Sequence, residues 1–400
     1  MPAIEVSSGI YWIGVNDRTT DLFEGLWPIT SEGVSYNAYV IDGEKKVLVD
    51  LAKDMKGDAL LAQIAEIVDP QALDYIVINH MEPDHTGVLR TFHRLAPDIK
   101  VLASPRAEKM LASFYEIEKN VHFVEDGETL DLGSHELVFY HTPMVHWPET
   151  IMTYESNQKV LFSCDAFGGY GALQGAIFDS DCKSLRFYED EALRYYANIV
   201  SLFARPVLKA IAKLAEVEID VVAPSHGLIW REHPERIIEL YKKWAEYAIV
   251  GPEVGVTLVY GTMYGHTEVM VDAIAQGIAR ANVPVNIFDV RHSHASYILP
   301  SIYARKGVLV GAPTYEGELF PPMAHLLDIV NRKRIRNRMA GYFGSYGWSG
   351  GARRELEKWA EELHWDVSEA WEFPGSPTSE TLEKGVELGY RFAQAVKESM

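Results

Sequence analysis

Seven residues of the types that bind metal ions lie between positions 80 and 226 of this 400-residue chain. Three imidazoles and three carboxylates, with a fourth histidine in reserve, are enough to hold a pair of metal ions. Any one of these side chains could simply be a surface or core residue, but their joint pattern favours a metal site. The candidate ligands are His80, Glu82, Asp84, His85, His146, Asp165 and His226.

These candidate ligands fall where predicted strands end. Loops at strand ends let a rigid scaffold bring side chains that are distant in sequence into one pocket. We therefore expect a single site built from four strand ends. The apolar stretches 75–78, 137–140, 160–162 and 220–223 precede His80, His146, Asp165 and His226, respectively.

The first cluster occupies residues 79–87, with the sequence Asn-His-Met-Glu-Pro-Asp-His-Thr-Gly. Pro83 should hold Glu82 in an extended conformation. If the whole segment is extended, alternate residues point to the same side. We therefore predict that His80, Glu82 and Asp84 leave the backbone on one side.

This pattern resembles the metallo-β-lactamase superfamily, whose signature is His-x-His-x-Asp-His followed by later His, Asp and His ligands. Glu82 stands where the signature has its second histidine. It replaces an imidazole nitrogen by a hard, anionic oxygen, and a carboxylate-rich set favours iron or manganese over zinc. The glutamate variant is the one that flavodiiron proteins carry.

A second kind of site is indicated after residue 250. Residues 254–260 read as a buried strand that leads into Gly261-Thr-Met-Tyr-Gly-His-Thr267 and then a helical pattern. Threonine hydroxyls, backbone N–H groups and the positive end of the helix can hold a phosphate. The loop lacks the glycine spacing of a dinucleotide fold and the Gly-Lys-Ser/Thr ending of a nucleotide-triphosphate loop. It resembles the first FMN loop of a flavodoxin.

Two more strand-end loops follow in flavodoxin order, in residues 307–317 and 342–348. Ligands of an open parallel sheet bind at the carboxyl ends of its strands, where all three loops would meet. Three such loops together predict an FMN site. The predicted FMN-binding residues are Thr262, Met263, Tyr264, Gly265, His266, Thr267, Pro313, Thr314, Tyr315, Glu316, Gly317, Ser345, Tyr346, Gly347 and Trp348.

The chain is too long for one core and suggests two domains, with a seam near residues 250–254. We expect residues 1–250 to form a metallo-β-lactamase-like αββα sandwich and residues 251–400 to form a flavodoxin-like doubly wound parallel sheet, with strand and helix in strict alternation. The charged tract 332–338 is most simply a solvated face. A hairpin is predicted across Asp42-Gly43, and helices over 58–67, 205–215 and 235–247.

Composition narrows the function classes. With 37 basic and 57 acidic residues the net charge is −20, which argues against nucleic acid or an anionic membrane as partner. No apolar run approaches the roughly 18 residues of a membrane span. We see no secretory signal and only two cysteines, which predicts a cytoplasmic protein. An iron–sulfur centre needs four cysteines, so we expect electrons to come from a separate molecule.

The resemblance to flavodiiron proteins covers essentially the whole chain. It implies FMN and two non-haem irons, and the reduction of dioxygen to water, nitric oxide to nitrous oxide, or both. It implies a head-to-tail homodimer or a tetramer, and an external donor such as rubredoxin or a reduced deazaflavin coenzyme. His80, Glu82 and His146 would bind one iron, and Asp84, His85 and His226 the other, with Asp165 between them; family members differ in whether the residue at His85 reaches its iron.

Two departures from the family pattern concern residues that could act near the irons. Glu24 lies in Phe-Glu-Gly, where many members have Phe-His-Gly. Tyr170 follows Asp165 in a stretch that differs from the usual Phe-Gly-Gln-His. We expect both as second-sphere groups that tune the choice of gas.

Two other functions remain open on sequence alone. A zinc hydrolase of the lactamase superfamily that carries an attached flavodoxin domain would use zinc-bound water to attack an ester or amide. A flavin electron carrier with a structural metal domain would be reduced and reoxidised without consuming a gas. Metal analysis and a hydrolysis assay would distinguish the zinc hydrolase from a flavodiiron protein. A measurement of gas consumption would distinguish the electron carrier.

Overall fold

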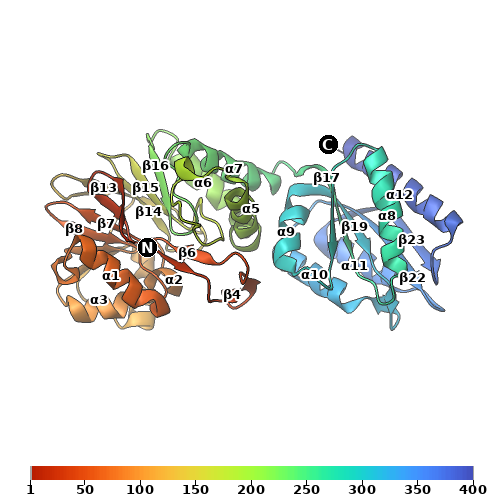
Figure 1. Cartoon of the computed structure of the whole chain (residues 1–400), viewed down its shortest axis with the longest axis horizontal. Coiled ribbons are helices and arrows are strands. Elements are labelled where there is room, and N and C mark those ends of the chain that lie inside the picture. Colours follow the sequence, from red (N-terminus) through yellow and green to blue (C-terminus); the bar gives the residue numbers. More distant parts are fainter. Residues whose placement is uncertain (1, 400) are drawn as a thin grey trace. The chain divides into compact units, whose positions relative to one another are not determined.

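The computed structural model describes residues 2–399, and the chain divides into two compact units, residues 1–245 and 246–400. Each unit has its own sheets and helices (Figure 1). Within the described residues, no helix is both long and apolar enough to cross a membrane.

Unit 1 is built on a seven-stranded and a five-stranded sheet. The first has the order β1-β2-β7-β8-β9-β10-β11 and the second β12-β13-β14-β15-β16. The strands of the first sheet are β1 (Ile4–Ser7), β2 (Ile10–Trp12), β7 (Tyr39–Asp42), β8 (Lys46–Val49), β9 (Tyr75–Val77), β10 (Lys100–Ala103) and β11 (Val121–Phe123). Those of the second are β12 (Thr129–Asp131), β13 (Glu136–His141), β14 (Ile151–Glu155), β15 (Val160–Cys164) and β16 (Val221–Pro224).

Helices cover the outer faces of these sheets, and two short hairpin-like pairs complete the unit (Figure 1). Strands β14 and β15 are buried along their whole length, as an inner layer requires. The helices are α1 (Gly57–Ile67), α2 (Pro83–Thr86), α3 (Leu89–Leu95), α4 (Glu108–Met110), α5 (Arg186–Tyr195), α6 (Ala204–Lys213) and α7 (Pro234–Tyr247), and the short pairs are β3 (Val15–Asp17) with β6 (Val34–Tyr36) and β4 (Leu22–Phe23) with β5 (Trp27–Pro28).

The local predictions for unit 1 hold at most positions. The predicted hairpin forms, with Asp42 opposite Lys46 at its end. All four predicted strands before the candidate ligands form as β9, β13, β15 and β16, and the three predicted helices form as α1, α6 and α7.

The prediction that His80, Glu82 and Asp84 share one extended segment is wrong. Glu82 is extended, with φ −62° and ψ 141°, but helix α2 begins at Pro83 and includes Asp84. Proline fits the first position of a helix because its missing N–H is not needed there. The chain therefore turns after Glu82, and Asp84 points to a different partner set from that of His80 and Glu82.

Unit 2 is a five-stranded parallel sheet with the order β18-β17-β19-β22-β23. The strand order reverses between β17 and β19, which is where an open α/β sheet binds its ligand. A small antiparallel pair, β20 with β21, interrupts the strict alternation of strand and helix. The strands are β17 (Glu253–Tyr260), β18 (Val285–Asp289), β19 (Arg305–Gly311), β20 (Thr314–Tyr315), β21 (Glu318–Leu319), β22 (Met339–Tyr346) and β23 (Asp366–Pro374).

Helices α8 and α12 pack together on one face of this sheet, around a core that includes Ile274 and Phe392 (Figure 1). The expectation that residues 332–338 form a solvated face is wrong for Arg338, which is 3% exposed. The helices are α8 (His266–Arg280), α9 (Ala295–Ala304), α10 (Pro321–Arg332), α11 (Ala352–Leu363) and α12 (Ser379–Glu398).

Candidate metal centre and flavin pocket

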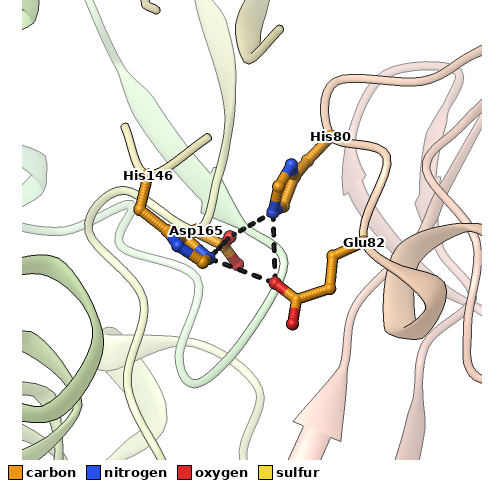
Figure 2. Close-up of side chains that lie close together, drawn as sticks. All are labelled: His80, Glu82, His146 and Asp165. Carbon is orange, nitrogen blue, oxygen red and sulfur yellow. Dashed lines mark hydrogen bonds and ion pairs between the residues drawn. The ribbon is translucent and has the colours of Figure 1, made fainter. Parts of the chain in front are cut away.

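The seven predicted metal ligands lie together in unit 1, in two groups. In the first group, Nε2 of His80 and Nε2 of His146 lie 3.2 and 3.1 Å from Oε2 of Glu82. The same two nitrogens lie 3.4 and 3.2 Å from Oδ2 of Asp165. Figure 2 shows these four side chains pointing toward one another. They follow strands β9, β13 and β15 in the chain.

The second group shares Asp165 with the first. Its other oxygen, Oδ1, lies 3.0 Å from Nε2 of His85 and 3.4 Å from Nε2 of His226. Asp84 closes the group, with its two oxygens 3.4 Å from Nε2 of His85 and of His226. The two oxygens of Asp165 thus face two different sets of donor atoms.

These distances fit metal coordination. Bonds of about 2.1 Å at right angles or wider put neighbouring donor atoms roughly 3.0–3.4 Å apart. Both oxygens of Asp84 and Asp165, and Nε2 of His85 and His226, are buried and make no hydrogen bond with acceptable geometry among the described residues. Buried polar atoms without hydrogen bonds call for another partner, and two cations supply it.

The carboxylates of the centre also favour positive charge beside them. Burial alone would lower the pKa of His80, but hydrogen bonds to Glu149 and Glu82 and the charge of Asp165 raise it to about 10. The pKa of His226 is likewise raised to about 10 against the effect of burial, because Asp165 and Asp84 face it. The carboxylates therefore favour protons on the imidazoles, and a bound metal cation replaces those protons.

Two imidazoles are oriented from behind by different groups. Nδ1 of His80 lies 2.7 Å from Oε1 of Glu149, which also accepts a hydrogen bond from the N–H of Met81. Nδ1 of His226 lies 2.6 Å from the carbonyl oxygen of Ser35. Each contact places the proton on Nδ1 and leaves Nε2 free to bind a metal.

Aromatic rings enclose the second group. Phe23 packs edge-on against His226 with ring centroids 5.6 Å apart, and Tyr195 lies 5.7 Å from the same ring. Burial, together with the charge of Asp165, raises the pKa of Tyr195 well above its ordinary value, which keeps the phenol protonated.

The two residues that we expected as second-sphere groups lie further out. Tyr170 packs against Phe23 and Tyr195, at 5.4 and 5.1 Å between ring centroids, so it stands behind the rings that contact His226. Glu24 is exposed, and its carboxylate accepts a hydrogen bond from the indole of Trp27 at 3.1 Å. Phe23 rather than Glu24 is the residue of that motif that packs on a candidate ligand.

A pocket of about 420 Å³ lies at the carboxyl ends of the strands in unit 2. All three predicted loops line it, and so does Gly375, which the sequence did not single out. Gly265, Thr267 and Gly317 do not line it. The rings of Trp348 and Tyr264 are 94% and 86% exposed at its rim, which leaves their faces open to a planar ligand.

The loop before α8 is shaped for a phosphate. Gly265 has φ 89°, a conformation that other residues rarely adopt, and its N–H donates to Oγ1 of Thr262 at 2.9 Å. Because Gly265 has no side chain to cap α8, the first N–H groups of this helix are left for a ligand. The pocket and the helix end together fit a flavin with a phosphate tail.

Sequence reasoning missed Glu149, Tyr195 and Phe23 as neighbours of the centre. Glu149 carries a weak signal, because it is a carboxylate three residues after His146 in the same loop. Tyr195 lies on α5, 31 positions before His226 in the sequence, and only tertiary packing brings the two rings together. No pattern within α5 indicates that contact.

Comparison with known proteins agrees with both sites. The family model described as ODP family beta lactamase matches residues 34–227, and the flavodoxin model matches residues 258–389. The anaerobic nitric oxide reductase flavorubredoxin of Escherichia coli O1:K1 / APEC is 37% identical over an alignment of 399 residues, with 98% of this chain and 82% of that protein covered. The chain belongs to the flavodiiron protein family.

Solved structures of flavodiiron proteins share the fold. The rubredoxin oxygen:oxidoreductase of Desulfovibrio gigas matches with a TM-score of 0.92 and 30% identity over 99% of each chain. The flavodiiron protein of Giardia intestinalis matches with a TM-score of 0.93 and 27% identity, over 100% of this chain and 97% of that one. As a flavodiiron protein, this chain is an oxidoreductase with FMN and a non-haem diiron centre as its cofactors.

Proposed function

We propose that this flavodiiron protein reduces dioxygen to water, nitric oxide to nitrous oxide, or both, with electrons that reach the diiron centre through FMN. The observation that carries the proposal is the position of Asp165, whose two oxygens face two separate sets of imidazole and carboxylate donors. Such an arrangement holds two metals close enough to bind both ends of a diatomic molecule.

We assign the iron ligands from the two groups. His80, Glu82 and His146 would hold one iron, and Asp84, His85 and His226 would hold the other, with Asp165 shared between the two groups. His85 belongs in the set because its Nε2 lies 3.0 Å from Oδ1 of Asp165, within the same range as the other donors.

The cofactors supply the electrons, and the residues of the chain position the cofactors. When bound, the pair of irons would supply two electrons and the reduced flavin two more. These four electrons match the number that reduces dioxygen to water, and they exceed the two that reduce a pair of nitric oxide molecules. The residues of this chain position the irons, and the buried rings of Phe23 and Tyr195 limit water beside His226. Glu82 is the most exposed of the first group, at 14%, so a substrate approaches from its side.

The flavin belongs in the pocket of unit 2. We propose that residues 1–250 are the diiron domain and residues 251–400 the FMN domain. The loop 262–267 would hold the phosphate, and the rings of Tyr264, Tyr315 and Trp348, which line the pocket, would bind the flavin. The other predicted FMN-binding residues that line the pocket are Pro313, Thr314, Glu316, Ser345, Tyr346 and Gly347, whereas Gly317 does not line it.

We propose that the electron path involves an external donor and a second copy of the chain. Trp348 and Tyr264 at the flavin rim are largely exposed, and Leu22, Leu26 and Leu202 of unit 1 are also exposed, at 43%, 49% and 40%. These apolar groups support a head-to-tail homodimer, or a tetramer, in which the flavin of one copy serves the irons of the other. We propose rubredoxin or a reduced deazaflavin coenzyme as donor, and the cytoplasm as location.

The decisive experiment is an anaerobic single turnover of the reduced, metal-analysed protein with dioxygen and, separately, with nitric oxide. We expect two irons and one FMN per chain, rapid flavin reoxidation, and water or nitrous oxide as product. The faster gas is then the preferred one. Zinc in the site, with ester or amide hydrolysis and flavin reoxidation no faster than that of free FMN, would overturn the proposal.

Electron transfer between copies has its own test. A variant without iron, Asp165→Ala, and a variant without FMN are each inactive alone. Refolded together as mixed dimers, they should recover activity, because one intact flavin then faces one intact diiron centre. Activity that stays absent in verified mixed dimers would refute transfer between copies, without bearing on the reaction itself.

A further inference from the structure

We infer that unit 1 carries a binding site for a small multivalent anion, such as a phosphate or a carboxylate compound, between helix α6 and the loop that presents His146. The site is a pocket of about 410 Å³ at the end of β13. It is separate from the flavin pocket, and none of the seven metal-ligand residues lines it.

The charge of the pocket is opposite to that of the protein. Three cationic side chains, those of Arg106, Lys209 and Lys213, line it, and no acidic residue is among the described residues of its lining. In a chain with 37 basic and 57 acidic residues, a pocket chosen at random would be acidic. Asp126, which lies outside the lining, pairs with Lys213, but the charges of Arg106 and Lys209 are left for a ligand to compensate.

Two of these cations lack an acidic partner. Lys213 pairs with Asp126 at 2.8 Å and also donates to the carbonyl of His141. Arg106 donates only to the carbonyl of Pro148, at 3.3 Å, and within residues 2–399 neither Arg106 nor Lys209 forms an ion pair. Two exposed positive charges therefore remain available at the mouth of the pocket.

A buried hydroxyl adds an independent indication of a ligand. Thr142 lines the pocket, is 3% exposed, and its Oγ1 has no hydrogen-bond partner among the described residues. An unsatisfied buried hydroxyl is costly, so it indicates a partner that is not part of the chain. A phosphate or carboxylate anion can accept a hydrogen bond from this hydroxyl. The same anion can pair with the positive charges of Arg106 and Lys209.

The pocket lies against both ends of the loop 142–150, which carries His146. Thr142 begins the loop, where its N–H donates to the carbonyl of Thr150 at 3.0 Å, and Arg106 holds Pro148 near the other end. The N–H of Val145, next to His146, donates to the carbonyl of Thr142 at 3.2 Å. A bound anion that engages Thr142 and Arg106 therefore tightens residues 142–150.

Calorimetric titration of the FMN-saturated, iron-loaded protein tests the site. The probes are inorganic phosphate and citrate at constant ionic strength, which separate phosphate from carboxylate ligands. We expect saturable binding of at least one probe, a Kd raised more than about tenfold in Arg106→Gln/Lys209→Gln, and a Kd raised about two- to tenfold in Thr142→Val, which removes only one hydrogen bond. The matched control is Arg354→Gln/Lys358→Gln on α11, which removes the same charge elsewhere and should bind normally.

Three results would overturn the inference. One is the absence of saturable binding of either probe. Another is equal loss of binding in the control pair, which would mean general charge attraction. The third is undiminished binding in Arg106→Gln/Lys209→Gln or in Thr142→Val, as expected if the anion bound at the metal centre instead. As a second readout, phosphate or citrate should slow amide hydrogen exchange in residues 142–150 of the wild type only.

Discussion

Oε1 of Glu149 lies 2.7 Å from Nδ1 of His80, so an anionic group supports the imidazole on the side away from the metal centre. Its counterpart at His226 is the neutral carbonyl of Ser35, at 2.6 Å from Nδ1. Both contacts orient an imidazole, but only the first adds negative charge. The two halves of the centre therefore differ in the charge that lies behind these two imidazoles.

Replacing Glu149 should weaken iron binding on the His80 side. Loss of a group that orients a metal-binding histidine costs about 10- to 100-fold in metal affinity. We expect such a loss in Glu149→Ala and a smaller one in Glu149→Gln, which retains a polar group without the charge. Iron retained after dialysis against graded chelator, together with the paramagnetic resonance spectrum of the half-reduced centre, measures the change.

The matched control for Glu149 is Glu155. It is also buried, and its Oε1 lies 3.0 Å from Nδ1 of His135, which is not among the seven metal-ligand residues. Glu155→Gln alters a buried histidine–carboxylate pair in the same way without touching the centre. If it released as much iron as Glu149→Gln, general destabilisation rather than orientation of His80 would explain the loss.

Asp17 should make unit 1 sensitive to acid. Burial alone would raise the pKa of this carboxyl, but hydrogen bonds from Thr20, Thr19 and Lys56 outweigh it and lower the pKa well below the ordinary value. A carboxyl with a lowered folded-state pKa stabilises the fold above its unfolded-state pKa of about 3.9, and this contribution is lost as the pH falls through the folded-state pKa.

Asp17→Asn should therefore be less stable than the wild type at pH 7, by about 2 kcal/mol for lost charge-assisted hydrogen bonds. The difference should persist down to about pH 4 and shrink below it. Urea unfolding of both proteins over this range measures it, and effects of acid on the metal centre cancel in the comparison. A difference that grew on acidification would contradict the assignment.

Arg338 should stabilise unit 2 from inside. Its guanidinium group donates to the carbonyls of Ile302 and Tyr303 at 2.9 and 2.6 Å, in the last turn of α9, and burial lowers its pKa to about 10. The guanidinium N–H groups thus donate to carbonyls that have no partner within the helix. The positive charge is also favourable at the carboxyl end of a helix. Arg338→Ala should lower the free energy of unfolding by about 3 kcal/mol.

Lysine should rescue Arg338 only in part, because an ammonium group cannot reproduce the planar fork of donors. Arg332→Ala serves as the control, since Arg332 is 76% exposed in its ion pair with Asp328 and should change stability by less than about 0.5 kcal/mol. Thermal and urea unfolding of the FMN-bound protein measure both effects. Equal effects in the two alanine variants would remove the helix-end explanation.

The sequence alone predicted the parts of the molecule that depend on local patterns. Alternating and buried apolar runs marked the strands before His80 and Asp165, and glycine-rich loops marked the flavin pocket. Asp84 shows the limit of this reasoning: we expected it to share an extended segment with His80 and Glu82, but the chain turns into α2 at Pro83. The contact of Glu149 with His80 joins residues 69 positions apart, and only tertiary packing creates it.

Gly265 should control FMN affinity through the backbone. With φ 89°, it holds the turn that leaves the first N–H groups of α8 free for the flavin phosphate. An alanine meets no atom within 4 Å there, so its effect comes from backbone strain alone, at about 1–2 kcal/mol. Relief of that strain distorts the phosphate turn, and we expect the Kd for FMN to rise about tenfold in Gly265→Ala.

Gly127, with φ 82° and equally open surroundings in unit 1, gives the control, because Gly127→Ala carries the same strain away from the flavin. Titration of the deflavinated proteins, followed by quenching of flavin fluorescence, measures both. An unchanged Kd in Gly265→Ala would show that the phosphate does not depend on this turn, whereas an equal loss in both variants would point to general destabilisation.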